Sequence, residues 1–282
     1  MAFKDKLAKA EALNDSLLCV GLDPFGVPVS LVADFNQAII ESTSDLVSSY
    51  KPNLAIYEGM GTEGMAALQR SLRHIPQDLV VIGDGKRGDI ENCGESYALA
   101  LFERYGFDAA TLYAYMGEDA IEPFRRWWPE KAVLILCRTS NRRSVDTQLL
   151  ETRGLDGVMR PIYLEYARQA LSWGSSENIG LVVGATFPED VRAARQQFPD
   201  VVFLIPGIGS QGGSIEPATR AAMDRDGRGF ILSASRSIAF AAGDPKEVTR
   251  RNLAAYAKAA RQAAADYREE INAARSLAAL QA

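Results

Sequence analysis

Several residue types on which common active sites depend are scarce in this sequence. Its 282 residues include one histidine, His74, which follows a polar helical pattern where we expect a solvated or structural side chain. The sequence therefore argues against a Ser–His–Asp triad and against metal sites built from several histidines. Proton transfer must then be carried out by lysine, aspartate, glutamate, tyrosine or cysteine.

Cysteines and long apolar stretches are scarce as well. Cys19, Cys93 and Cys137 are widely spaced and form no CxxC pair, so neither a disulfide framework nor a zinc site is expected. The first residues are polar and charged, without the apolar segment of a secretion signal. No stretch approaches the roughly 18 apolar residues that cross a membrane. We expect a cytoplasmic protein with no membrane partner.

The sequence has no excess of positive charge. Lys and Arg number 31 against 36 Asp and Glu, which gives a formal net charge of −5. A nucleic-acid-binding protein is expected to carry a basic face, so nucleic acid is not an expected partner. An anionic small molecule would need a local cationic pocket, because the overall field does not attract it.

Eight short apolar runs alternate with longer amphipathic stretches. The runs cover residues 17–23, 50–58, 79–86, 107–113, 132–138, 179–185, 202–207 and 229–235. Nearly continuous apolar runs are typical of parallel strands buried on both faces. The pattern predicts an α/β protein, a (β/α)8 TIM barrel formed by one domain over residues 1–282, since such barrels need about 250 residues. The alternative is a doubly wound open sheet, but no GxGxxG turn follows an early strand.

Two segments exceed what a plain barrel requires. Residues 139–158 form a long polar connection after the fifth run, and connections of this length are usually functional or mobile. Residues 246–282 form an Ala-rich, charged helical pattern. We expect a helical C-terminal extension that continues along the surface and could reach a partner subunit.

Polar side chains gather where the apolar runs end, and a barrel of this kind carries its active site at the C-terminal ends of its strands. In DGKRGD (84–89), strand alternation places Asp84 and Lys86 on the same side, with Asp89 in the loop that follows. Lys51 lies between Tyr50 and the apolar rest of the second run, where an embedded charge is costly unless it is paired. An inward-facing Lys51 would lie beside Asp84. The alternatives are a solvated strand-to-helix turn and a surface lysine.

A second cluster predicts an anion site. The glycine-rich PGIGSQGG (206–213) follows the seventh run, and SASR (233–236) ends the eighth. Barrels often bind phosphate in these two loops through backbone N–H groups. Arg236 can hold a phosphate bidentately, and Gln211 can donate from the loop. The alternative is a glycine-rich turn without a ligand.

Taken in order, these motifs resemble those of the orotidine 5′-phosphate decarboxylases, particularly the longer bacterial (type 2) subgroup. The resemblance runs through VGLDP, KPN, DGKRGDI, CRTSN, PGIGSQGG and SASRSI, from residue 20 to residue 238. Each motif alone is short, but the combination in this order is specific. The resemblance implies decarboxylation of orotidine 5′-monophosphate to UMP, the last step of de novo pyrimidine nucleotide synthesis, without a metal or other cofactor.

The resemblance also implies a role for each residue of a Lys–Asp–Lys–Asp tetrad. Lys86 would protonate C6 of the pyrimidine, Asp84 would lie beside the substrate carboxylate, and Lys51 would orient Asp84 and touch the ribose. Asp89 would enter the site of the other subunit of a homodimer. The substrate-binding residues by resemblance are Asp23 for ribose, Ser140 for the pyrimidine, Gln211 and Arg236 for phosphate, and Ser235 next to Arg236.

One residue departs from the family pattern, and two other functions compete. Cys93 stands where many members carry a threonine that reaches the neighbouring site, so we leave Cys93 out of the site.

One competing function is a Mg²⁺-dependent sugar-phosphate decarboxylase or aldolase of the same barrel family. Those enzymes place an acidic metal ligand where this chain has Lys51, and Mg²⁺ needs oxygen ligands. The other is a non-catalytic barrel that binds a phosphate ligand.

Overall fold

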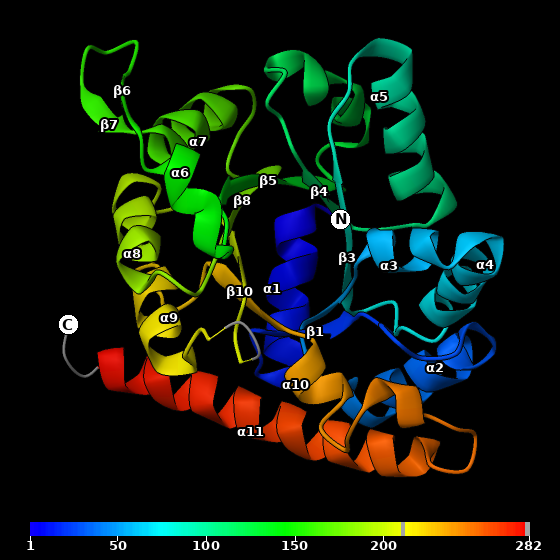
Figure 1. The fold of residues 1–282 in the computed structure, drawn as a ribbon. Coiled ribbons are helices and arrows are strands. Elements are labelled where there is room, and N and C mark those ends of the chain that lie inside the picture. The colour runs from blue at the N-terminus through cyan, green and yellow to red at the C-terminus, as the bar shows by residue number, and fades with distance from the viewer. Residues whose placement is uncertain (210–211, 280–282) are drawn as a thin grey trace.

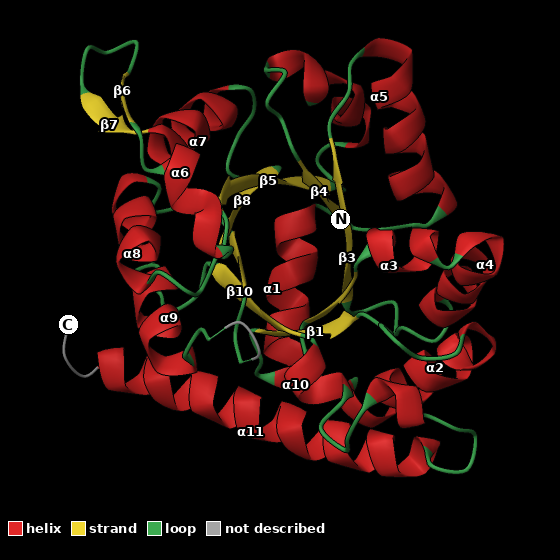
Figure 2. Cartoon of the chain, in the orientation of Figure 1, coloured by secondary structure: helices red, strands yellow, loops and turns green. Residues whose placement is uncertain are grey.

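A closed barrel of parallel strands forms the centre of the protein (Figures 1 and 2). The structure, a computed structural model, describes residues 1–209 and 212–279, and within these ranges eight strands close the barrel. They are β1 (Leu18–Leu22), β2 (Ser49–Pro52), β3 (Val80–Arg87), β4 (Ala109–Leu112), β5 (Ala132–Arg138), β8 (Ile179–Val183), β9 (Phe203–Pro206) and β10 (Phe230–Ala234). Each pairs in parallel with its neighbour in this order, and β10 pairs back with β1. The predicted TIM barrel is confirmed.

The strands form where the apolar runs are buried on both faces. Every residue of β1, β4, β5, β8 and β10 is buried. The run at 50–58 is the exception, because β2 ends at Pro52 and a helix, α3 (Leu54–Gly59), follows. The side chain of Asn53 accepts a hydrogen bond from the Ala55 N–H at 3.2 Å and caps that helix. The second half of this run is therefore helical, although it was predicted as strand.

Helices surround the barrel, as Figure 1 shows. They include α2 (Val32–Thr43), α4 (Gly61–Leu72), α5 (Glu91–Ala98), α7 (Ile162–Ser172), α8 (Pro188–Gln197), α9 (Ile215–Ala222) and the short α10 (Arg236–Ala239). The C-terminal extension is α11 (Leu253–Ala279), which runs across α2, α9 and α10 of its own chain. Arg261 on α11 forms a bidentate ion pair with Asp45 at 2.7 and 2.8 Å. The extension therefore covers the barrel surface.

An N-terminal helix, α1 (Phe3–Asn14), closes one end of the barrel. Figure 2 shows this helix in the middle of the ring of strands. Its Lys6 pairs with Asp108, just before β4, at 2.7 Å, and its Glu11 pairs with Arg228, just before β10, at 3.0 Å. Both partners precede strands, so α1 covers the N-terminal end and leaves the C-terminal ends for the site.

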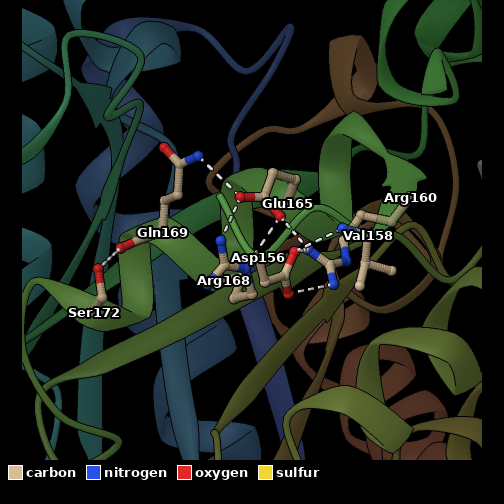
Figure 3. A network of polar contacts seen from close by, with 7 residues as sticks. All are labelled: Asp156, Val158, Arg160, Glu165, Arg168, Gln169 and Ser172. Carbon is tan, nitrogen blue, oxygen red and sulfur yellow. Dashed lines mark hydrogen bonds and ion pairs between the residues drawn. The ribbon is translucent and has the colours of Figure 1, made fainter. Parts of the chain in front are cut away.

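The long connection after β5 folds into short elements. It contains a short helix, α6 (Val145–Gln148), and an antiparallel hairpin of β6 (Glu151–Arg153) and β7 (Met159–Pro161). Figure 3 shows how the hairpin is tied to α7: Arg160 bridges Asp156 at 2.8 Å and Glu165 at 2.5 Å. Arg168 also pairs with Glu165, at 2.6 Å. Ion pairs thus fix the base of the hairpin to the barrel.

Candidate active site

One pocket of about 650 Å³ opens at the C-terminal ends of the strands. Volumes of roughly 300–1,000 Å³ are usual for small-molecule sites. Seven of the residues predicted from the sequence line it together: Asp23, Lys51, Asp84, Lys86, Ser140, Ser235 and Arg236. Two predicted residues stand apart: Gln211 lies outside the described residues, and Asp89 is not among the pocket-lining residues of its own chain.

Asp84 lies between two lysines at the base of this pocket. Lys51 Nζ donates to Asp84 Oδ2 at 2.8 Å, and Lys86 Nζ donates to Asp84 Oδ1 at 2.5 Å. The side chains of Lys51 and Asp84 are only 6% and 9% exposed, whereas that of Lys86 is 47% exposed. Lys51 therefore lines the pocket with little of its side chain exposed, and Lys86 is the more accessible of the two lysines.

The ion pairs keep both buried groups charged. Burial alone would raise the pKa of Asp84, but the positive charges of Lys51 and Lys86 hold this pKa well below its usual value. Burial would likewise lower the pKa of Lys51, and the negative charges of Asp84 and Asp23 more than offset it, so this pKa lies above its usual value. A carboxylate and an ammonium group thus persist in a site shielded from water.

The backbone at Lys86 is not a regular strand. Lys86 has φ +47°, a left-handed conformation that is uncommon for a side-chain-bearing residue. The pairing of β3 with β4 is also interrupted: Gly83 pairs with Ala110, and the next pair is Arg87 with Leu112. Asp84 and Lys86 do meet, as alternation predicts, but a bulge in β3 sets the position of the lysine.

A second set of polar contacts links the ends of β1, β2 and β10. Asp23 accepts hydrogen bonds from Ser235 Oγ at 2.6 Å and from the Asn53 N–H at 3.1 Å. Gly21 allows this arrangement, because a Cβ there would lie 1.8 Å from Ser235 Oγ. The carboxylate of Asp23 is thereby fixed at the pocket wall.

The predicted anion site forms another wall of the pocket. Pro206, Gly207 and Ile208 line it next to Ser235 and Arg236. Gly207 has φ +102°, which favours glycine at this turn. Arg236 begins α10 and is exposed, so its guanidinium can meet an anion entering from solvent.

The loop that carries Ser140 is supported from beneath. Arg138, at the end of β5, is fully buried; it donates to Asp190 at 2.6 Å and to Gln148 at 3.2 Å. Thr186 donates to the Ser140 carbonyl at 3.2 Å. Arg138 was not predicted as a functional residue, although a charged residue at the end of an apolar run is a signal that could have found it.

The described part of the chain has neither a cluster of metal ligands nor a membrane-spanning helix. Residues 1–209 and 212–279 contain no group of three or more His, Cys, Asp or Glu arranged to hold a metal ion. None of the helices there is long and apolar enough to cross a membrane.

Comparison with known proteins gives a consistent result. The family model described as "Orotidine 5′-phosphate decarboxylase / HUMPS family" matches residues 16–252. The orotidine 5′-phosphate decarboxylase of Dehalococcoides mccartyi is 42% identical over 275 residues, which are 96% of this chain and 98% of the relative. That of Herpetosiphon aurantiacus is 44% identical over 251 residues, 86% of this chain and 90% of the relative.

Solved structures agree with the sequence relatives. The OMP decarboxylase of Leishmania donovani superposes with a TM-score of 0.84 at 37% identity, covering 98% of this chain and all of that one. The UMP synthase of the same organism superposes with a TM-score of 0.86 at 39% identity. There the match covers 98% of this chain but spans only 57% of the longer UMP synthase.

Proposed function

The chain belongs to the orotidine 5′-phosphate decarboxylase / HUMPS family, and we propose that it converts orotidine 5′-monophosphate to UMP, with Lys86 as the proton donor. The observation that carries this proposal is the Lys51–Asp84–Lys86 cluster at the base of a pocket whose rim holds Arg236. One end of the pocket thus suits an anionic phosphate, and the other presents an acid next to a fixed carboxylate.

The reaction needs only a proton and a correctly placed charge. The bond between C6 and the carboxylate breaks, CO₂ leaves, and the electron pair stays on C6. The Lys86 ammonium group then transfers its proton to C6, giving UMP and a neutral amine that regains a proton from solvent. The exposure of Lys86 allows both steps.

Asp84 and Lys86 favour the transition state over bound substrate. Two carboxylates about 4 Å apart repel by roughly 4 kcal/mol at an effective dielectric near 20. The repulsion between Asp84 and the substrate carboxylate vanishes as CO₂ leaves, while the attraction of Lys86 for the charge on C6 grows. Only interactions that improve toward the transition state accelerate the step.

The remaining pocket residues bind the parts of the nucleotide that do not react. We assign Arg236, the glycine-rich loop and Gln211 to the phosphate, although Gln211 lies outside the described residues. Asp23, Ser235 and Lys51 are assigned to the ribose, and Ser140 to the pyrimidine. Phosphate binding far from C6 supplies energy that holds the carboxylate against Asp84.

The proposal includes a homodimer in which Asp89 completes the partner's site. Exposed apolar side chains occur in the segment after Asp89 and in the loop after β4, a group that we call the rim patch: Ile90, Tyr97, Tyr113, Tyr115 and Met116. Arg87 connects the two segments, because its carbonyl accepts the Tyr113 N–H and its guanidinium lies 5.2 Å from the Tyr97 ring centre. An apolar patch of this kind is typical of a protein–protein contact.

The three cysteines are free, which favours a reducing compartment, and we place the reaction in the cytoplasm.

The geometry of Lys51 argues against the Mg²⁺-dependent alternative, because Lys51 donates to Asp84 at the position where that chemistry needs an oxygen ligand.

The test is a decarboxylation assay on EDTA-treated protein. Orotidine 5′-monophosphate is added and the loss of its ultraviolet absorbance is followed. We expect rapid conversion to UMP, and none by Lys86→Ala, while that variant still binds UMP. No conversion by the folded wild-type protein would contradict the reaction, and unchanged turnover in Lys86→Ala would contradict the assigned proton donor.

A further inference from the structure

Thr111, near the end of β4, contacts both charged residues of the catalytic cluster that come from β3. Its side chain is buried, with the residue 1% exposed, and it lines the pocket. Thr111 Oγ1 donates to Asp84 Oδ1 at 2.9 Å and accepts from the Lys86 backbone N–H at 3.0 Å. One hydroxyl therefore links the carboxylate and the backbone of the lysine.

We propose that Thr111 is a positioning residue for the decarboxylation, whose hydroxyl holds Asp84 and Lys86 in the geometry that the reaction requires. The proposal rests on the proposed function of the same site. Thr111 does not contact the reacting atoms in this proposal, because it acts through Asp84 and Lys86.

The strand pairing explains why a side chain is needed here. Between the pairs Gly83–Ala110 and Arg87–Leu112, β3 has three residues and β4 has one, Thr111. The bulge removes the regular backbone ladder at this point. The Thr111 hydroxyl accepts the Lys86 N–H in place of a backbone carbonyl from β4.

The hydroxyl also makes the two contacts depend on each other. A threonine hydroxyl has one proton to donate and lone pairs to accept. When the hydroxyl donates a hydrogen bond to Asp84, its lone pairs are directed to the Lys86 N–H. Lys86 has φ +47°, and such a backbone persists only where its surroundings hold it. Loss of the hydroxyl would free both the carboxylate and the lysine backbone.

The effect should appear in kcat and not in substrate binding. Thr111 lies on β4, while the residues assigned to phosphate and ribose come from the ends of β1, β2, β9 and β10. A displacement of a catalytic group by about 1 Å can cost on the order of 100-fold in rate. We expect Thr111→Val to lower kcat by about 10- to 100-fold, with KM and the Kd of UMP within twofold of wild type.

The test compares four proteins in one assay: wild type, Thr111→Val, Thr111→Ser and Thr43→Val. Thr111→Ser keeps the hydroxyl and should retain kcat within a few-fold of wild type. Thr43→Val is the matched control, since Thr43 is also buried and hydrogen-bonded, to Tyr50 Oη at 2.7 Å, but lies on α2 away from the pocket. Thr43→Val should lower the midpoint temperature of thermal unfolding and leave kcat unchanged.

Binding of UMP to each variant reports that the site is folded. If Thr111→Val does not fold, Thr111→Cys replaces it, since a thiol is a weaker donor and acceptor than a hydroxyl, and a loss of kcat is again expected. Wild-type kcat in the valine variant, or a serine variant as slow as valine, would overturn the positioning role while wild-type turnover upholds the proposed function. No turnover by wild-type protein would overturn both.

Discussion

Asp84 is the residue whose loss should affect stability and chemistry together. It pairs with Lys51 and Lys86, and it is the carboxylate bonded to the buried Lys51 ammonium. Removing one partner of a buried ion pair is costly because the other charge is left in a low dielectric. Asp84 thus keeps a cation inside the barrel and also lines the pocket.

We expect Asp84→Asn to abolish turnover and to lower the free energy of unfolding by about 3–5 kcal/mol. Lys51→Met added to Asp84→Asn removes the unpaired cation and should restore part of that stability without restoring activity. Urea unfolding followed by circular dichroism measures both variants. A single variant as stable as wild type would show that Lys51 does not depend on Asp84.

The residues of this cluster differ in how far the sequence could reveal them. Asp84 and Lys51 could be predicted, because a charge embedded in an apolar run needs a partner. The left-handed backbone of Lys86 and the role of Thr111 could not. Both depend on the interrupted register of β3 against β4, and a register is a property of two strands that neither sequence shows alone.

The secondary-structure elements also differ in how far the sequence could predict them. Buried parallel strands have a clear apolar signature, so each of the eight runs overlaps a barrel strand. The helix α3 was missed because its apolar residues continue those of β2, and only Asn53 marks the boundary. The β6–β7 hairpin was missed because the ion pair that holds its base joins Arg160 to Glu165 on α7, outside the hairpin itself.

The C-terminal helix α11 packs against the glycine-rich loop that we assign to the phosphate. Tyr267 Oη donates to Ser237 Oγ at 2.8 Å, and Ser237 follows Arg236. The same hydroxyl lies 2.7 Å from where a Cβ on Gly209 would be, so Tyr267 packs directly against the glycine-rich loop. The helix thus connects the barrel exterior to the residues assigned to phosphate binding.

We expect Tyr267→Phe to raise KM for orotidine 5′-monophosphate by up to about tenfold, the value of one hydrogen bond, with kcat at saturation unchanged. Tyr256→Phe is the control on the same helix, because it also loses a hydroxyl contact, to the Asp244 carbonyl at 2.6 Å, but does not touch the loop. Steady-state kinetics on both variants measure KM and kcat for comparison with wild type. Equal KM values for the two would mean that α11 only covers the barrel.

Within the described chain, Asp89 is not among the residues that line the pocket, and the side chains of the rim patch are exposed. Asp89 comes from the loop between β3 and α5, at the side of the barrel where Ile90 and Tyr97 are exposed. A twofold dimer joined through this patch would give both protomers the same contact. Each site would then contain one residue of the other subunit.

Mixed dimers test this arrangement directly. Lys86→Ala and Asp89→Ala should each be inactive alone, because every site lacks one tetrad member. If Asp89 crosses the interface, a mixed dimer has one site with both defects and one site with none. Equal amounts of the two proteins, unfolded and refolded together, should regain about one quarter of wild-type activity when subunits pair at random in a twofold dimer. If Asp89 serves its own chain, every site keeps one defect, and the mixture stays inactive.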